Sequence, residues 1–168
     1  MGLDFHAAAL GDWVPDFVRV NNRLAGIVRE PSAAEISAHR GLLAANTLRV
    51  ENLELFVHHI APGAALRDAG DVDQETSDDR AAADEDLRAD LATLIRAAQT
   101  QVASPERLHR IYRLLRPFTD ANGRCGRVFW MWQVMRAAPD ELAEIVRLEL
   151  SDSRHPLHSD TVLHSTMM

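Results

Sequence analysis

Apolar residues recur along most of this chain at the three- and four-residue spacings that are typical of amphipathic helices. Two clear examples are residues 50–60, "VENLELFVHHI", and residues 104–118, "SPERLHRIYRLLRPF". The two-residue alternation of a half-buried strand is found nowhere over a long segment, and only a weak instance lies between residues 65 and 72. The pattern therefore predicts an all-α fold.

Several helix ends can be predicted from local chemistry. Ser32 and Glu35 have the spacing of a capping box, in which each side chain accepts a hydrogen bond from the other residue's backbone amide. Ser104 is a typical N-cap, and Pro105 behind it stands where a missing N–H is harmless. Pro117 is expected to end the same helix.

One predicted helix differs from the others because it is apolar almost all round. It covers "RCGRVFWMWQVMRAA", residues 124–138, and this composition predicts a central, buried helix. Between the helices, residues 65–80 have no strong period, so a loop or a short β-hairpin is expected there. Residues 151–168 are polar and irregular. We expect a single domain over residues 1–150 and a weakly ordered tail over residues 151–168.

Composition narrows the class of protein. A chain of 168 residues with 46% hydrophobic content fits one globular domain with a sizeable core. Its lone cysteine, Cys125, excludes an internal disulfide framework. No apolar run has the length of a membrane span, and the N-terminus lacks a signal-peptide pattern, so a cytoplasmic protein without a membrane partner is expected.

Charge is distributed unevenly. The net charge of −7 argues against general nucleic-acid binding, which needs a basic surface. Residues 71–90 hold nine acids against two arginines, whereas residues 107–127 hold six arginines against Asp120 alone. The second segment therefore indicates a cationic site.

The stretch "PFTDANGRCGR", which follows Leu115 and Arg116, combines a proline stop, a turn and the start of a helix. Because the first backbone amides of a helix have no acceptor within it, such a loop forms an anion site. Gly123 allows close backbone approach to a phosphate, and Asn122 tolerates unusual turn angles.

Charged side chains of the same stretch support a phosphate ligand. Arg124 and Arg127 are three residues apart, so both can lie on one helical face and bind phosphate oxygens. Asp120 supplies a hard oxygen ligand that suits magnesium. These residue types together indicate a nucleotide site.

The stretch also resembles the central motif of Fic domains, H-P-F-x-[DE]-G-N-[GK]-R-x-x-R. Seven fixed positions match, namely Pro117, Phe118, Asp120, Asn122, Gly123, Arg124 and Arg127. The resemblance implies a helical bundle around the motif helix. It also implies a reaction in which a hydroxyl of a target protein attacks a nucleotide phosphate, most often moving AMP from ATP. The donor stays open, since Fic relatives transfer other phosphate-linked groups too.

Roles for individual residues follow from this resemblance. Asp120 would hold Mg²⁺, Asn122 and Gly123 would form the anion cradle, and Arg124 and Arg127 would bind the outer phosphates.

The first departure from the family pattern concerns catalysis. Arg116 stands where the family has its histidine general base, and arginine has no lone pair with which to accept a proton. Loss of a positioned base typically costs ~10²- to 10⁴-fold in rate. His109 lies about 10 Å away by the helical rise of ~1.5 Å per residue, which is too far to replace it directly.

Other departures affect the loop and its regulation. Ala121 replaces a glycine, and its Cβ disfavours left-handed backbone angles. Many Fic proteins carry an inhibitory helix, [ST]-x-x-x-E-[GN], whose glutamate blocks the outer phosphate site. The nearest stretch here, "NNRLAG", has Ala25 in place of that glutamate. The family's flap strand is replaced by the acidic residues 71–87.

Alternatives remain open at two levels. Arg116 is either an arginine at the margin of the core, a phosphate- or target-binding group, or an engineered substitution. The protein is either a Fic-like transferase with impaired or redirected activity, or an inactive pseudoenzyme that binds a nucleotide or a protein.

Overall fold

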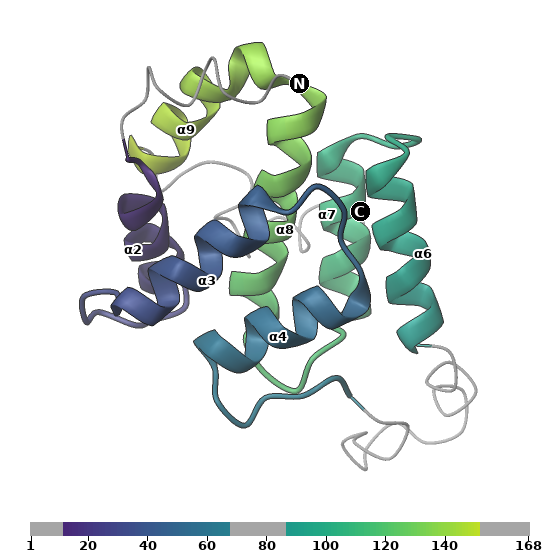
Figure 1. Ribbon diagram of the computed structural model, residues 1–168, viewed down its shortest axis with the longest axis horizontal. Coiled ribbons are helices and arrows are strands. Elements are labelled where there is room, and N and C mark those ends of the chain that lie inside the picture. Colours follow the sequence, from purple (N-terminus) through teal and green to yellow (C-terminus); the bar gives the residue numbers. More distant parts are fainter. Residues whose placement is uncertain (1–11, 68–86, 152–168) are drawn as a thin grey trace, which may run out of the picture.

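A computed structural model (Figure 1) describes residues 12–67 and 87–151 of the chain. Within these ranges the chain forms helices and no strand, which confirms the all-α prediction. No described helix has the length and apolar character that a membrane crossing requires. The elements are α2 (Val14–Leu24), α3 (Ala33–Ala44), α4 (Val50–Ile60), α6 (Leu87–Gln99), α7 (Pro105–Leu115), α8 (Asn122–Ala137), the 3₁₀ turn η1 (Pro139–Glu141) and α9 (Leu142–Ser151).

The predicted caps are confirmed. The Ser32 side chain accepts a hydrogen bond from the Glu35 amide, and the Glu35 carboxylate accepts one from the Ser32 amide. Ser104 accepts from the Arg107 amide and starts α7. These local hydrogen bonds satisfy amides that a helix cannot satisfy by itself.

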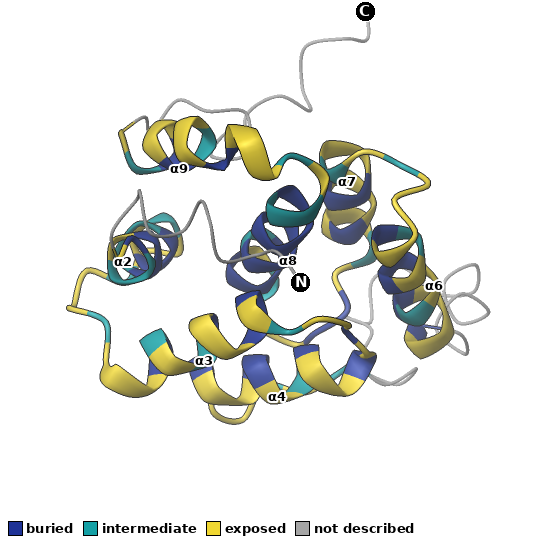
Figure 2. Cartoon of the chain, turned by 45° about the horizontal axis from the view of Figure 1, so that its top comes forward, coloured by how far each residue is buried: buried dark blue, intermediate teal, exposed yellow. Residues whose placement is uncertain are grey.

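Helix α8 is the most extensively buried element of Figure 2, in agreement with its apolar sequence. Ten of its 16 residues are buried, among them Phe129 and Trp132. Helix α7 packs closely on it at Gly126, where a Cβ would lie only 2.8 Å from Cδ1 of Tyr112. Since real contacts of that length do not occur, a side chain at Gly126 would push α7 away from α8.

The segment after α4 pairs with the loop between α7 and α8. Leu66 and Phe118 form an isolated antiparallel bridge, and the Arg67 amide donates to the Pro117 carbonyl at 2.9 Å. Of the loop or hairpin expected over residues 65–80, the structure describes residues 65–67, which include this bridge. Residues 68–80 lie outside the described residues, as does the expected tail from residue 152 onward. The bridge fixes one wall of the loop that carries the motif.

Candidate functional site

The loop between α7 and α8 is closed by the side chain of Asn122. Its Oδ1 accepts a hydrogen bond from the Phe118 amide at 2.9 Å, and its Nδ2 donates to the Phe118 carbonyl at 2.6 Å. Phe118 itself is buried, so the loop is anchored in the core. Asn122 therefore acts as a clamp within the loop.

Ala121, and not Asn122, takes the unusual turn angles. Its φ of 61° and ψ of 14° lie in the left-handed region, where a residue with a Cβ pays roughly 1–2 kcal/mol. The expectation that Asn122 would adopt such angles is wrong, because Asn122 is already the first residue of α8. The strained position is the one where the Fic motif has glycine.

The N-terminus of α8 presents unbonded backbone amides. The Cys125 amide donates to the Ala121 carbonyl at 2.9 Å and is the first to bond within the helix. The amides of Asn122, Gly123 and Arg124 come earlier and have no acceptor inside the helix. Together with the helix dipole, they favour an anion at this end.

A cavity of about 490 Å³ opens at this helix end. Its volume falls within the range of small-molecule sites, ~300–1,000 Å³. The described lining residues include four arginines against one acid, so the described part of the lining is cationic. The charged lining residues are Arg113, Arg116, Asp120, Arg124 and Arg127, and Leu24, Ala25, Ile27, His109, Thr119, Ala121, Asn122 and Gly123 complete it.

Arg127 lies over the first turn of α8. Its Nη1 would be 3.3 Å from a Cβ placed on Gly123. Its Nε donates to Oδ1 of Asn21 at 2.6 Å, and its Nη2 donates to the Asn21 carbonyl at 3.1 Å. A guanidinium held beside the helix N-terminus can bind an anion together with the unbonded amides.

Arg124 is directed elsewhere. Only 6% of its side chain is exposed, its Nη1 donates to the Ile60 carbonyl at 2.9 Å, and the same nitrogen is 4.0 Å from Oε1 of Glu35. Burial lowers the pKa of Arg124 from its usual value. The structure thus separates the two arginines that the sequence placed on one phosphate-binding face: Arg127 lies at the loop, and Arg124 ties α8 to the C-terminus of α4.

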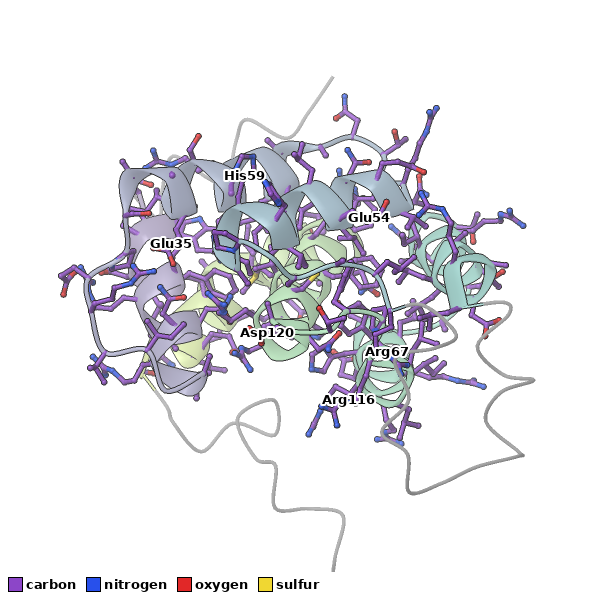
Figure 3. All side chains as sticks on the ribbon, turned by 90° about the horizontal axis from the view of Figure 1, so that it is seen from below. Glu35, Glu54, His59, Arg67, Arg116 and Asp120 are labelled. Atoms are coloured by element: carbon purple, nitrogen blue, oxygen red, sulfur yellow. The ribbon has the colours of Figure 1, made fainter. Side chains whose placement is uncertain are left out.

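Arg116 leaves the helix that precedes it. It is the C-cap of α7, with a left-handed φ of 44°, and its side chain is exposed, at the lower edge of the molecule in Figure 3. Its carbonyl accepts a hydrogen bond from Nε of Arg67 at 2.6 Å. Arg116 thus ends α7 directly before Pro117, and the residue lines the cavity.

His109, which the sequence places two helical turns before Arg116, lines the same cavity. Its Nδ1 lies 3.1 Å from the Gly126 carbonyl, which can only accept, so Nδ1 carries the proton and Nε2 keeps a lone pair. Burial lowers the pKa of His109 to about 4, which leaves the imidazole neutral near pH 7.

Asp120 is exposed and lines the cavity, and its Oδ1 accepts a hydrogen bond from the Ala121 amide. Over residues 12–67 and 87–151, no three His, Cys, Asp or Glu side chains gather into a metal-binding group. A single carboxylate would be compatible with Mg²⁺ only together with ligands from outside the chain, because Mg²⁺ commonly uses one or two carboxylates, phosphate oxygens and water.

The C-terminal end of α2 forms the opposite wall of the cavity through Leu24, Ala25 and Ile27. Ala25 occupies the position at which the inhibitory motif of Fic proteins has glutamate. Because Ala25 has only a methyl group, this wall contributes no carboxylate to the described lining of the cavity.

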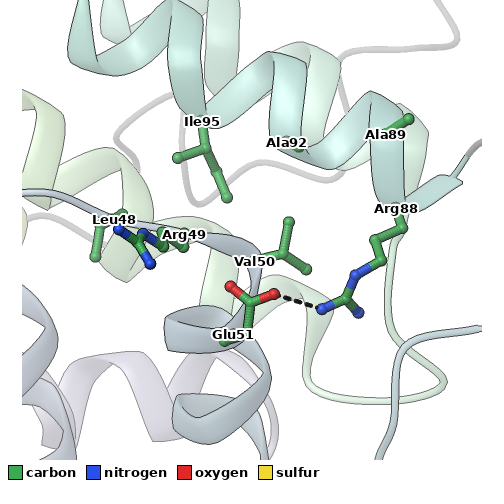
Figure 4. Close-up of a pocket in the computed structure, with 8 residues that line it drawn as sticks. All are labelled: Leu48, Arg49, Val50, Glu51, Arg88, Ala89, Ala92 and Ile95. Carbon is green, nitrogen blue, oxygen red and sulfur yellow. Dashed lines mark hydrogen bonds and ion pairs between the residues drawn. The ribbon is translucent and has the colours of Figure 1, made fainter.

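A second cavity, of about 520 Å³, lies between the start of α4 and α6 (Figure 4). Its floor is apolar, and Arg88 at its rim is bound to Glu51 at 2.7 Å and to Glu54 at 3.0 Å. Its charged described lining residues are Arg49, Arg88 and Glu51, and Glu54 also binds Arg88, so this lining is less cationic than that of the α8 site despite the similar volume. The α8 cavity is the better candidate.

Comparison with protein-family models, with curated proteins and with solved structures gave no match. The Fic resemblance therefore remains a prediction from the motif residues, and the function has to be argued from the cavity itself.

Proposed function

We propose that the cavity at the N-terminus of α8 binds the phosphate groups of ATP or another nucleotide, accompanied by Mg²⁺. The observation that carries the proposal is the placement of Arg127 over Gly123, next to the amides that open α8. Backbone N–H groups and a fixed guanidinium are the usual ligands of phosphate oxygens. Asp120 would hold the magnesium ion, which would offset the negative charge of the phosphates.

In this proposal the chain is Fic-like but a poor transferase. Transfer of AMP to a protein hydroxyl by the family route needs a base, and Arg116 cannot accept a proton. Arg113, Arg116 and Arg127 in the lining would stabilise negative charge on a bound phosphate in the ground state as well as in the transition state, so they favour binding more than rate. Nucleotide binding without efficient transfer is the function that we expect.

Residual transfer is the second candidate, and His109 is the observation that favours it. Its neutral imidazole lies in the wall of the same cavity, with Nδ1 fixed by the Gly126 carbonyl and a lone pair on Nε2. A hydroxyl attacking the α-phosphate would lose its proton to that nitrogen while pyrophosphate leaves. The low pKa of His109, about 4, makes it a weak base, so this route would be slow.

Calorimetric titration tests the binding proposal. Inorganic pyrophosphate and ATP, each with and without MgCl₂, are titrated into the wild-type protein, Arg127→Ala and Arg96→Ala. Arg96 is exposed on α6 and absent from the described lining, so its variant removes the same charge from a remote place. We expect binding that Arg127→Ala weakens at least tenfold and Arg96→Ala leaves unchanged. Equal affinity in all three proteins would remove the phosphate site.

A turnover assay separates the two candidates. The protein is incubated with ATP labelled in the adenine moiety, and the release of pyrophosphate and the labelling of proteins are followed. Binding without release supports the binding protein. Release that disappears in His109→Gln supports residual transfer.

A further inference from the structure

A row of hydrogen bonds, buried from α3 as far as Asn21, leads from the backbone of α3 to the partly buried guanidinium of Arg127. His39 on α3 has its Nδ1 2.7 Å from the Glu35 carbonyl and its Nε2 3.2 Å from Nδ2 of Asn21 on α2. Nδ2 of Asn21 also donates to the Arg124 carbonyl at 3.2 Å, and Oδ1 of Asn21 accepts from Nε of Arg127 at 2.6 Å. The row thus joins α3, α2 and α8.

Only one assignment of protons satisfies every member of this row. The Glu35 carbonyl can only accept, so Nδ1 of His39 carries the ring proton and Nε2 is an acceptor. The two hydrogens of the Asn21 amide then go to Nε2 of His39 and to the Arg124 carbonyl. Its oxygen is left to face Nε of Arg127, which can only donate. The amide of Asn21 therefore has a single orientation.

Water cannot easily substitute for these partners. Asn21 is 1% exposed and His39 is fully buried. The His39 ring is held edge-on between two aromatic rings, with centroid distances of 6.3 Å to Phe17 and 4.9 Å to Phe56. A buried polar group without a partner is costly, so an unpaired Asn21 amide would turn or draw its neighbours out of place.

From this geometry we infer that His39 and Asn21 are positioning residues of the anion site: His39 fixes the amide of Asn21, and Asn21 holds the guanidinium of Arg127 over the first turn of α8. The inference rests on the proposed function for its effect on ligand affinity, but the hydrogen bonds themselves do not depend on it. Neither residue lines the cavity among its described residues, so both act on a bound phosphate through Arg127.

Variants at position 39 can separate positioning from general support of the fold. His39→Leu fills the position with an apolar side chain of similar size but removes the Nε2 acceptor of Asn21. His39→Gln places an amide oxygen where it can accept from Asn21. We expect His39→Leu to weaken pyrophosphate binding about tenfold in calorimetry, and His39→Gln to recover most of that loss. Unchanged affinity in His39→Leu, or an equal loss in both variants, would overturn the inference.

A double-mutant cycle tests whether His39 acts through Arg127. In the Arg127→Ala background His39→Leu should have no further effect on pyrophosphate affinity, even where it lowers the melting temperature. An equal fold-loss in both backgrounds would show that His39 supports the site by another route. If His39→Leu does not fold, Asn21→Ala breaks the same row on α2 and takes its place with the same expectation.

A ligand-free readout keeps this inference distinct from the proposed function. In ¹H–¹⁵N spectra selective for arginine, the Nε–H of Arg127 should give a resolved, slowly exchanging signal, assigned by its absence in Arg127→Ala. The signal should persist in His39→Gln and exchange faster in His39→Leu and Asn21→Ala. A signal that is unaffected by these variants contradicts the inference. Failure of the wild-type protein to bind pyrophosphate, with the signal behaving as expected, contradicts only the proposed function.

Discussion

The guanidinium of Arg127 lies against Gly123, four residues earlier in the same helix, with Nη1 3.3 Å from the position of a Cβ on that glycine. The contact exists because Arg127 is drawn to Asn21, which accepts from it at 2.6 Å. Gly123 is thus the point at which backbone amides and a fixed cation meet, and changes there should alter ligand affinity more than stability.

Gly123→Ala should weaken pyrophosphate binding several-fold without lowering the melting temperature. The added methyl group displaces the end of the Arg127 side chain, whereas alanine is favoured over glycine within a helix by ~1 kcal/mol. Gly41→Ala on α3 is the matched control, because nothing lies within 4 Å of a Cβ there. The control should gain the same stability and keep full affinity. A loss of affinity common to both variants would argue against the proposed contact.

Ala121→Gly should stabilise the protein by about 1 kcal/mol, since glycine adopts the left-handed φ of 61° without a Cβ penalty. Urea denaturation measures the change. Ala143→Gly, at an exposed position of α9, should instead lower the free energy of unfolding by ~0.5–1 kcal/mol, because glycine has a lower helix propensity than alanine. If Ala121→Gly destabilises the protein as much as Ala143→Gly does, the loop is not strained at Ala121.

Ala25→Glu should reduce pyrophosphate and ATP binding at least tenfold. The new carboxylate enters a cavity lined by four arginines and competes with the ligand for their charge. Ala44→Glu adds the same charge at an exposed site of α3 outside the described lining and should bind normally. Normal binding by Ala25→Glu would mean that phosphates lie away from α2.

Arg116→His should raise nucleotidyl transfer from ATP, because it returns a proton acceptor to the loop at the position where the Fic motif has its base. The measurement is pyrophosphate release in the presence of MgCl₂. Arg110→His, on the exposed face of α7 and outside the described lining, controls for an adventitious imidazole. No gain in a variant that still binds ATP would place the defect elsewhere in the loop.

The free energy of unfolding should fall as the pH is lowered from about 6.5 towards 4. Burial lowers the pKa of both His39 and His109 from 6.5 to about 4, so within this window the unfolded chain binds protons that the folded chain does not. Each histidine contributes about 3 kcal/mol above pH 6.5, and that contribution is lost as the pH drops through the window. Urea denaturation at several pH values measures the slope.

The double variant His39→Gln, His109→Gln is the control for this slope and should remove most of it. Glu35 affects the free energy of unfolding only at lower pH. Burial would raise its pKa, but hydrogen bonds from Arg29, Ser32 and Asn22 lower it to about 2, so its contribution is lost only below pH 4.5. An unchanged slope in the double variant would assign the acid sensitivity to other groups.

What the sequence determined by itself is the local structure. The capping box of Ser32 and Glu35, the start of α7 at Ser104 and its end before Pro117 all depend on contacts within about four residues, which a sequence displays directly. The turn and helix start after Pro117 also predicted where unbonded amides would lie. The strain at Ala121 could be anticipated for the same reason, since the Cβ penalty is a property of one residue.

The tertiary structure decided which side chains share the cavity. The sequence alone gives no reason to treat Arg124 and Arg127 differently, because both fit one face of the helix. In the structure Arg124 binds the Ile60 carbonyl at the end of α4, whereas Arg127 binds Asn21, which is 106 residues away. His109 is fixed in the cavity wall by the Gly126 carbonyl of α8, and His39 lies on a helix that helical periodicity cannot place next to α8. Hydrogen bonds between residues so far apart in the chain depend on how the helices pack, and packing is set by the whole core rather than by any local pattern.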